Sequence, residues 1–157
     1  MNATPDGAST IELDWFLPDV WFGRAIVWVE RIRNRRARYC HGGIRTPTAY
    51  YEAVETGFRK LDAPPRPPDA TRAMSVDSAA LQHGSHYLEG QIGHRYSFIT
   101  ILADLASAVS GVHIICTIAS EHVCSAQMAW ALIYFGVLET DSPDAATPDS
   151  LAQMYGV

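Results

Sequence analysis

The stretch Tyr-Cys-His-Gly-Gly-Ile (residues 39–44) places a histidine beside two glycines in an otherwise apolar run. Its aromatic and branched residues predict a β-strand, and the glycines permit close approach of another backbone. A second stretch, Val-Cys-Ser-Ala-Gln-Met-Ala-Trp (residues 123–130), places a cysteine where an apolar helix should begin. A strand bearing His41 packed against a helix opening with Cys124 would bring an imidazole and a thiol together.

A thiol at the start of a helix has distinctive chemistry. The helix N-terminus carries partial positive charge and unpaired backbone N–H groups, which lower the pKa of a thiol and can hold an oxyanion. A nearby histidine can activate the thiolate and later protonate a leaving group. The alternative is a purely structural role, in which Cys124 is a core residue beside Met128 and Trp130 and His41 is an ordinary packed histidine.

Helices and strands are predicted in the flanking regions from hydrophobic periodicity and capping signals. We expect helices over 24–33, 78–88, 96–109, 124–135 and after 147. The first has arginines opposite its apolar residues, the second is capped by Asp77 or Ser78, and the fourth by Ser120 or Glu121. We expect strands over 39–45, 48–53, 54–61, 71–76 and 112–118. The proline-rich stretch 62–69 must be a loop. This order predicts an α+β domain, a small antiparallel sheet packed against helices, over 13–157 after a disordered lead-in at 1–12.

Composition narrows the function classes. Of the 157 residues, 48% are hydrophobic and 18% charged, which is typical of a globular protein rather than a disordered one. The formal net charge of −5 gives no expectation of nucleic-acid binding. Three cysteines, Cys40, Cys116 and Cys124, are an odd number and predict no disulfide framework. We expect no secretory signal, because the first ten residues contain no basic region followed by an apolar core. We expect no membrane span, because no apolar run approaches about 20 residues.

Basic residues are unevenly distributed along the chain. Six of the 12 Lys and Arg residues fall between positions 24 and 38, namely Arg24, Arg31, Arg33, Arg35, Arg36 and Arg38. This basic segment is interpreted either as the solvated end of a helix and its following loop, or as a contact surface for an anionic polymer.

The order of the two central segments, histidine before cysteine, resembles that of the circularly permuted papain-like hydrolases related to the NlpC cell-wall peptidases, including small phage members. Residues 39–44 are similar to the family's Ser-His-Val-Gly-Ile strand, and Cys124-Ser125 to its nucleophile segment. Further similarities are Arg24 to Trp28, Tyr51-Glu52-Ala53, Gly93 to Tyr96, and Thr147-Pro148-Asp149. The departures are Gly42 in place of Val, Ser97 in place of Asp, and Ala126 where Glu often follows.

The resemblance implies a papain-like cysteine peptidase or amidase that needs no metal or organic cofactor. Cys124 would be the nucleophile, with its backbone N–H in the oxyanion hole, His41 the general base and acid, and Glu52 the residue that orients the imidazole. Strands joined at Thr46-Pro47 would bring Glu52 roughly opposite His41, with Glu55 and Glu121 as other candidates. Tyr96 and Ser125 would lie near the substrate.

The implied substrate is an amide bond, with peptidoglycan stem peptides as the leading class. Without a signal peptide, the protein would be made in the cytoplasm and delivered to the wall by a virion, a membrane lesion or a secretion machine.

The alternatives to a cysteine hydrolase are a zinc site, a phosphate-binding or serine-nucleophile enzyme, a binding protein and an assembly protein. Zinc could in principle be held by Cys40, His41, Cys116, His122 and Cys124, but no Cys-x-x-Cys pair exists and neighbouring strand residues point to opposite faces. No phosphate-binding glycine loop and no serine-nucleophile elbow is present. A binding protein using Arg31 to Arg38, or an assembly protein that kept the fold without the chemistry, is the alternative to an enzyme.

Overall fold

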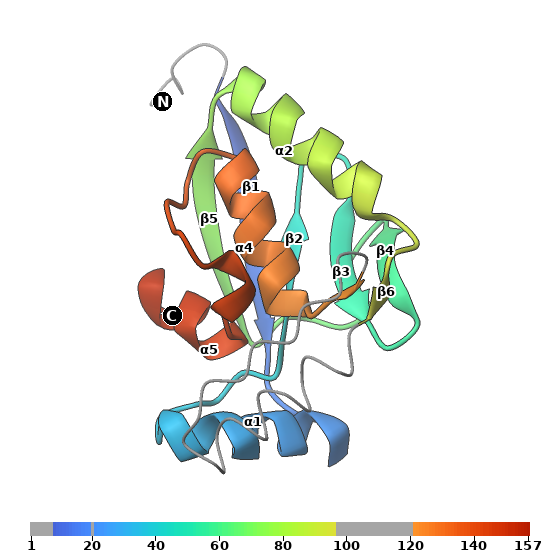
Figure 1. Ribbon diagram of the computed structural model, residues 1–157. Coiled ribbons are helices and arrows are strands. Elements are labelled where there is room, and N and C mark those ends of the chain that lie inside the picture. Colours follow the sequence, from blue (N-terminus) through green and yellow to red (C-terminus); the bar gives the residue numbers. More distant parts are fainter. Residues whose placement is uncertain (1–7, 20, 97–120) are drawn as a thin grey trace.

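The computed structural model describes residues 8–19, 21–96 and 121–157. Its centre is a five-stranded antiparallel sheet in the order β4-β3-β2-β1-β5 (Figure 1). The strands are β1 (Ser9–Phe16), β2 (His41–Arg45), β3 (Tyr50–Val54), β4 (Gly57–Leu61) and β5 (Ala70–Val76). A separate parallel pair consists of β6 (Arg95–Tyr96) and β7 (Glu121–His122). The class is therefore α+β with an antiparallel sheet, as the sequence predicted.

The four α-helices of the described residues are α1 (Trp21–Arg33), α2 (Ser78–Gln91), α4 (Cys124–Tyr134) and α5 (Pro148–Met154), with a 3-10 turn at Pro143–Ala145. α2 and α4 lie side by side in front of the sheet, whereas α1 stands apart at one end of it (Figure 1). Asp77 caps α2 by accepting from the Ala80 N–H at 2.7 Å. No helix in the described part of the chain is long and apolar enough to cross a membrane.

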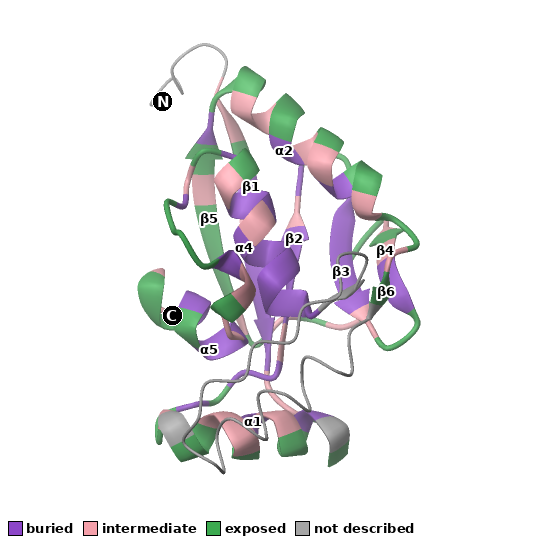
Figure 2. Ribbon diagram, in the orientation of Figure 1, coloured by how far each residue is buried: buried purple, intermediate pink, exposed green. Residues whose placement is uncertain are grey.

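Side-chain alternation gives the sheet two unlike faces. The face toward α2 and α4 is apolar, with Leu13, Trp15 and Ile44 almost fully buried (Figure 2). The opposite face contains Asp14, buried and bonded to Arg45 at 2.8 Å. Burial of the apolar face supplies the hydrophobic stabilisation, and the polar face is free to hold charged groups in fixed positions.

Several sequence expectations need correction. The lead-in predicted at 1–12 is wrong over 9–12, because Ser9 begins β1 and pairs with Val76 of β5. The predicted cap of α4 is also wrong: Val123 is the N-cap, and Glu121 lies in β7. The helix predicted over 96–109 is wrong at its first residue, because Tyr96 lies in β6. Outside the described residues lie the rest of that helix, Ser120 and the strand predicted over 112–118.

Close packing of α2 on α4 generates a stability prediction. A Cβ added at Gly84 would lie 2.2 Å from Cδ1 of Phe135, a buried ring, whereas one added at Gly90 of the same helix would meet nothing within 4 Å. We expect Gly84→Ala to lower the free energy of unfolding by about 1–3 kcal/mol through overpacking. The matched Gly90→Ala change should raise it by about 0.5–1 kcal/mol. Urea denaturation would measure both, and equal effects at the two sites would contradict this packing.

Candidate active site

His41 is the first residue of β2, and its position follows from strand register. β2 pairs with β1 as far as Phe16–His41, but its pairing with β3 stops two residues earlier, at Gly43–Glu52. His41 and Glu52 are thus diagonal neighbours on the same face of the sheet, within reach of long side chains. The edge of β2 at His41 and Gly42 is left open to a third element.

The imidazole of His41 is held by a buried carboxylate. Its Nε2 lies 2.8 Å from Oε2 of Glu52, whose side chain is only 2% exposed. The second carboxylate oxygen, Oε1, accepts from Nε of Arg59 at 2.9 Å and also from Nη2. Arg59 stands opposite Glu52 in the β3–β4 pairing. The carboxylate therefore has a cationic donor on each oxygen, and Nδ1 is the imidazole nitrogen left open to other groups.

Cys124 opens α4, and this end of the helix meets the open edge of β2. The thiol hydrogen-bonds with the His41 side chain and with the backbone N–H groups of Gly42 and Ser125. Gly42 has no room for a side chain, because a Cβ there would lie 2.3 Å from Sδ of Met128 in α4. A valine at position 42 would push α4 away, so glycine suits the close contact that brings the thiol to His41.

Electrostatics at the site favour a charged pair. Burial would raise the pKa of the Cys124 thiol, but the hydrogen bond and positive charge of His41 and the two backbone donors lower it below its ordinary value of 9.0. Burial would likewise lower the pKa of His41, yet its bonds to Cys124 and Glu52 raise it to about 9. The pKa of Glu52, which burial would raise, is lowered by its bonds to His41 and Arg59. The site therefore favours thiolate, imidazolium and carboxylate at neutral pH.

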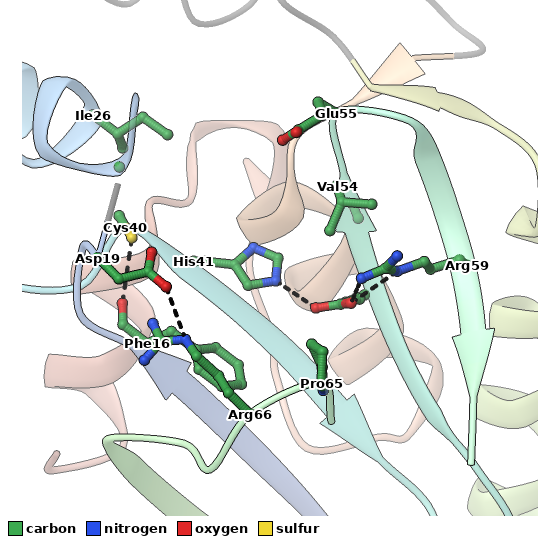
Figure 3. A pocket seen from close by; sticks show the side chains of 13 residues that line it. Phe16, Asp19, Ile26, Cys40, His41, Val54, Glu55, Arg59, Pro65 and Arg66 are labelled. Carbon is green, nitrogen blue, oxygen red and sulfur yellow. Dashed lines mark hydrogen bonds and ion pairs between the residues drawn. The ribbon is translucent and has the colours of Figure 1, made fainter. Parts of the chain in front are cut away.

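A cleft of about 320 Å³ opens beside the imidazole (Figure 3). It is lined by His41, Cys40, Asp19, Arg66, Glu55 and Arg59, together with Phe16, Ile26 and Pro65 among others. Cys124 is 3% exposed and is not among the residues that line this cleft; it lines a separate small pocket with Gly42, Glu52 and Met128. Cys40 lines the cleft, but burial and the proximity of Cys124 raise the pKa of its thiol to about 12. The thiol that lines the cleft and the thiol with the lowered pKa thus belong to different cysteines, Cys40 and Cys124, and both are buried.

The C-terminal segment fixes the backbone around both central residues. Asp149, buried in α5, accepts from the backbone N–H of Arg38 at 2.8 Å and of Tyr39 at 3.0 Å, just before the histidine strand. The Ser125 hydroxyl donates to the carbonyl of Ala146 at 2.6 Å. These bonds connect the tail to β2 on one side and to the start of α4 on the other.

The structure brings Cys124, His41 and Glu52 together, as the sequence prediction required. Glu55 lies at the cleft rim, and the Ser125 hydroxyl is engaged with the tail, so only its backbone faces the thiol. The structure does not describe Cys116, nor the side chains of Tyr96, Glu121 and His122.

Two residues of the site were missed by sequence reasoning. Arg59 could have been found as the opposite charge facing Glu52 across a hairpin. Asp149 belongs to the segment Thr147-Pro148-Asp149, which the sequence singled out. Its role was not predicted, because the backbone groups that it binds lie more than 100 residues away in the sequence.

Comparison with protein-family models finds no family that matches this chain, and comparison with curated proteins finds no match either. Within the described residues, no three His, Cys, Asp or Glu side chains are grouped to hold a metal ion.

The first prediction concerns thiol reactivity. A thiolate reacts with iodoacetamide and a thiol does not, so Cys124 should be alkylated below pH 9 while Cys40 stays unmodified near neutral pH. His41→Ala removes the imidazole, whose hydrogen bond and charge lower the thiol pKa most, and leaves burial and the two backbone donors, so labelling of Cys124 at pH 7 should fall at least about tenfold. Peptide mass spectrometry at several pH values measures each cysteine separately. Labelling indifferent to His41 would rule out the pair.

The second prediction concerns the imidazole. Glu52→Gln keeps a hydrogen-bond acceptor but removes the charge, so the pKa of His41 should fall from about 9 toward 6.5. His41 would then lose its proton at lower pH than in the wild type. Titration of the histidine C–H signals by nuclear magnetic resonance would report the change, with Glu55→Gln as the matched control at the cleft rim. A His41 pKa unchanged by Glu52→Gln would contradict the assigned role.

Proposed function

We propose that this chain is a cysteine hydrolase of the permuted papain-like, NlpC-related type that cleaves amide bonds, with peptidoglycan stem peptides as its substrate. One observation carries the proposal: the Cys124 thiol has a lowered pKa and is hydrogen-bonded to an imidazole whose other nitrogen is held by buried Glu52. A structural cysteine and a packing histidine need no such third partner. The resemblance of the surrounding segments supports the choice of family and of substrate class.

The reaction follows from the charged pair. The Cys124 thiolate attacks the amide carbonyl carbon, and the carbonyl electrons move to oxygen. The resulting oxyanion is stabilised by the backbone N–H of Cys124, since the first N–H groups of a helix have no partner within it. His41 then donates its proton to the leaving nitrogen, the C–N bond breaks and a thioester remains. Water, deprotonated by His41, hydrolyses the thioester to a carboxylic acid and regenerates the thiolate.

Glu52 and Arg59 act on this cycle through His41. The carboxylate keeps Nε2 protonated and directs Nδ1 toward the thiol, as an orienting acid does in other nucleophile–histidine sites. Arg59 holds the second carboxylate oxygen, which prevents rotation of the carboxylate and keeps it ionised. Arg59 is a positioning residue rather than a catalytic one.

The test is digestion of purified peptidoglycan sacculi, with release of new amino groups measured chemically and the cleaved bond identified by mass spectrometry. We expect Cys124→Ala and His41→Ala to lose activity by a factor on the order of a thousand or more. His86→Ala changes an exposed histidine of α2 and should retain it.

Three outcomes separate the components of the proposal. Turnover that survives Cys124→Ala would contradict the nucleophile. Intact sacculi, with Cys124 still labelled in a His41-dependent way, would overturn the substrate and leave the pair standing. Failure of both assays would favour the binding or assembly role of the segment 31–38.

A further inference from the structure

The helix α1 carries an apolar stripe on its solvent face. Trp21, Ala25, Trp28 and Ile32 are spaced four, three and four residues apart, which places them on one side of the helix. All four are exposed, with 79% of Trp21, 61% of Trp28 and 45% of Ile32 accessible to solvent. The sequence predicts arginines on the side of this helix opposite its apolar residues. The structure turns the largest apolar side chains of this helix outward.

The opposite side of α1 is attached to the protein. Gly23 and Val27 are buried, and Ile26 lines the cleft near His41 (Figure 3). A Cβ at residue 23 would lie 2.9 Å from the sulfur of Cys40, so the helix approaches the start of β2 closely. The helix therefore has one packed side, and the stripe is its other, outward side.

Arginines border the stripe. Arg24 and Arg31 lie on one side of it, and Arg35, Arg36 and Arg38 follow in the loop, all exposed. Among the described residues, the salt bridges that involve a lysine or an arginine use Arg45, Arg59, Lys60 and Arg66 instead. A chain of net charge −5 thus presents a local cationic surface around two tryptophans.

We propose that this face of α1 docks on the surface of an anionic lipid bilayer. Tryptophan favours the interface between headgroups and acyl chains, and arginines beside it attract acidic headgroups. The 13-residue helix would lie in the plane of the membrane. An antiparallel two-fold pairing of two copies through this face would set arginines against arginines. A nucleic acid would use the arginines but leave the aliphatic part of the stripe in water. Because Ile26 lines the cleft, docking would hold the cleft close to the lipid surface.

The experiment is co-sedimentation of the full chain with vesicles of phosphatidylglycerol and phosphatidylcholine, compared with vesicles of phosphatidylcholine alone. We expect binding to the anionic vesicles only, weakened by salt, with a blue shift of tryptophan emission. Trp28→Ser should weaken binding on the order of tenfold and Arg24→Gln about fivefold. The matched controls, exposed Ile92→Ser and exposed Arg72→Gln, should leave it unchanged.

Each remaining result overturns the proposal. Absence of binding to anionic vesicles, or equal binding to neutral ones, rules out the lipid surface. A dimer in solution that Trp28→Ser dissociates would assign the stripe to a second copy. Binding to a DNA duplex that Trp28→Ser leaves intact, without vesicle binding, would assign the arginines to nucleic acid. The inference does not rest on the proposed hydrolysis, and Cys124→Ala should bind vesicles as the wild type does.

Discussion

The charge of Glu52 constrains more of this structure than any other group does. A carboxylate that is 2% exposed costs several kcal/mol to desolvate, and it persists only because His41 and Arg59 each donate to one of its oxygens. These bonds connect β2, β3 and β4 through one side chain, so strand register and imidazole orientation are set together. A slip of one residue between β2 and β3 would place Glu52 on the apolar face without a partner.

The contrast between the faces of the sheet explains where the site lies. One face is covered by α2 and α4 and excludes water, while the other is polar and opens into the cleft beside His41. The thiol belongs to the apolar side and the imidazole to the polar side. They meet where β2 and β3 cease to pair, because only there can the start of α4 reach past the strand. The thiol and the imidazole therefore meet at a gap in the sheet, and the absence of a side chain at Gly42 lets α4 approach β2 closely there.

Tertiary hydrogen bonds then reinforce this arrangement. Asp149 holds the backbone before His41, and Ser125 bonds to Ala146 in the chain leading to the same tail. The C-terminal segment thus fixes the backbone beside both the thiol and the imidazole, through hydrogen bonds to Tyr39 and Ser125. Ile26 of the helix α1 forms part of the cleft wall. When α1 docks on a surface through its outward stripe, this wall of the cleft lies next to that surface.

Local sequence determined the elements with strong signals: Asp77 before α2, Thr147 with Pro148 at α5, and the prolines of the loop 62–69. Local sequence also singled out Cys124, as a thiol at a helix start, and His41, as a histidine beside two glycines, whereas Glu52 was chosen through the resemblance to a known family. Only the tertiary structure decided that β1 begins at Ser9, since that short polar-apolar run becomes a strand by pairing with β5. The tertiary structure alone decided the roles of Arg59 and Asp149, because each bonds to a group on another element of the fold. It also decided that Trp28 points outward, because the exposure of a side chain depends on which other elements cover it.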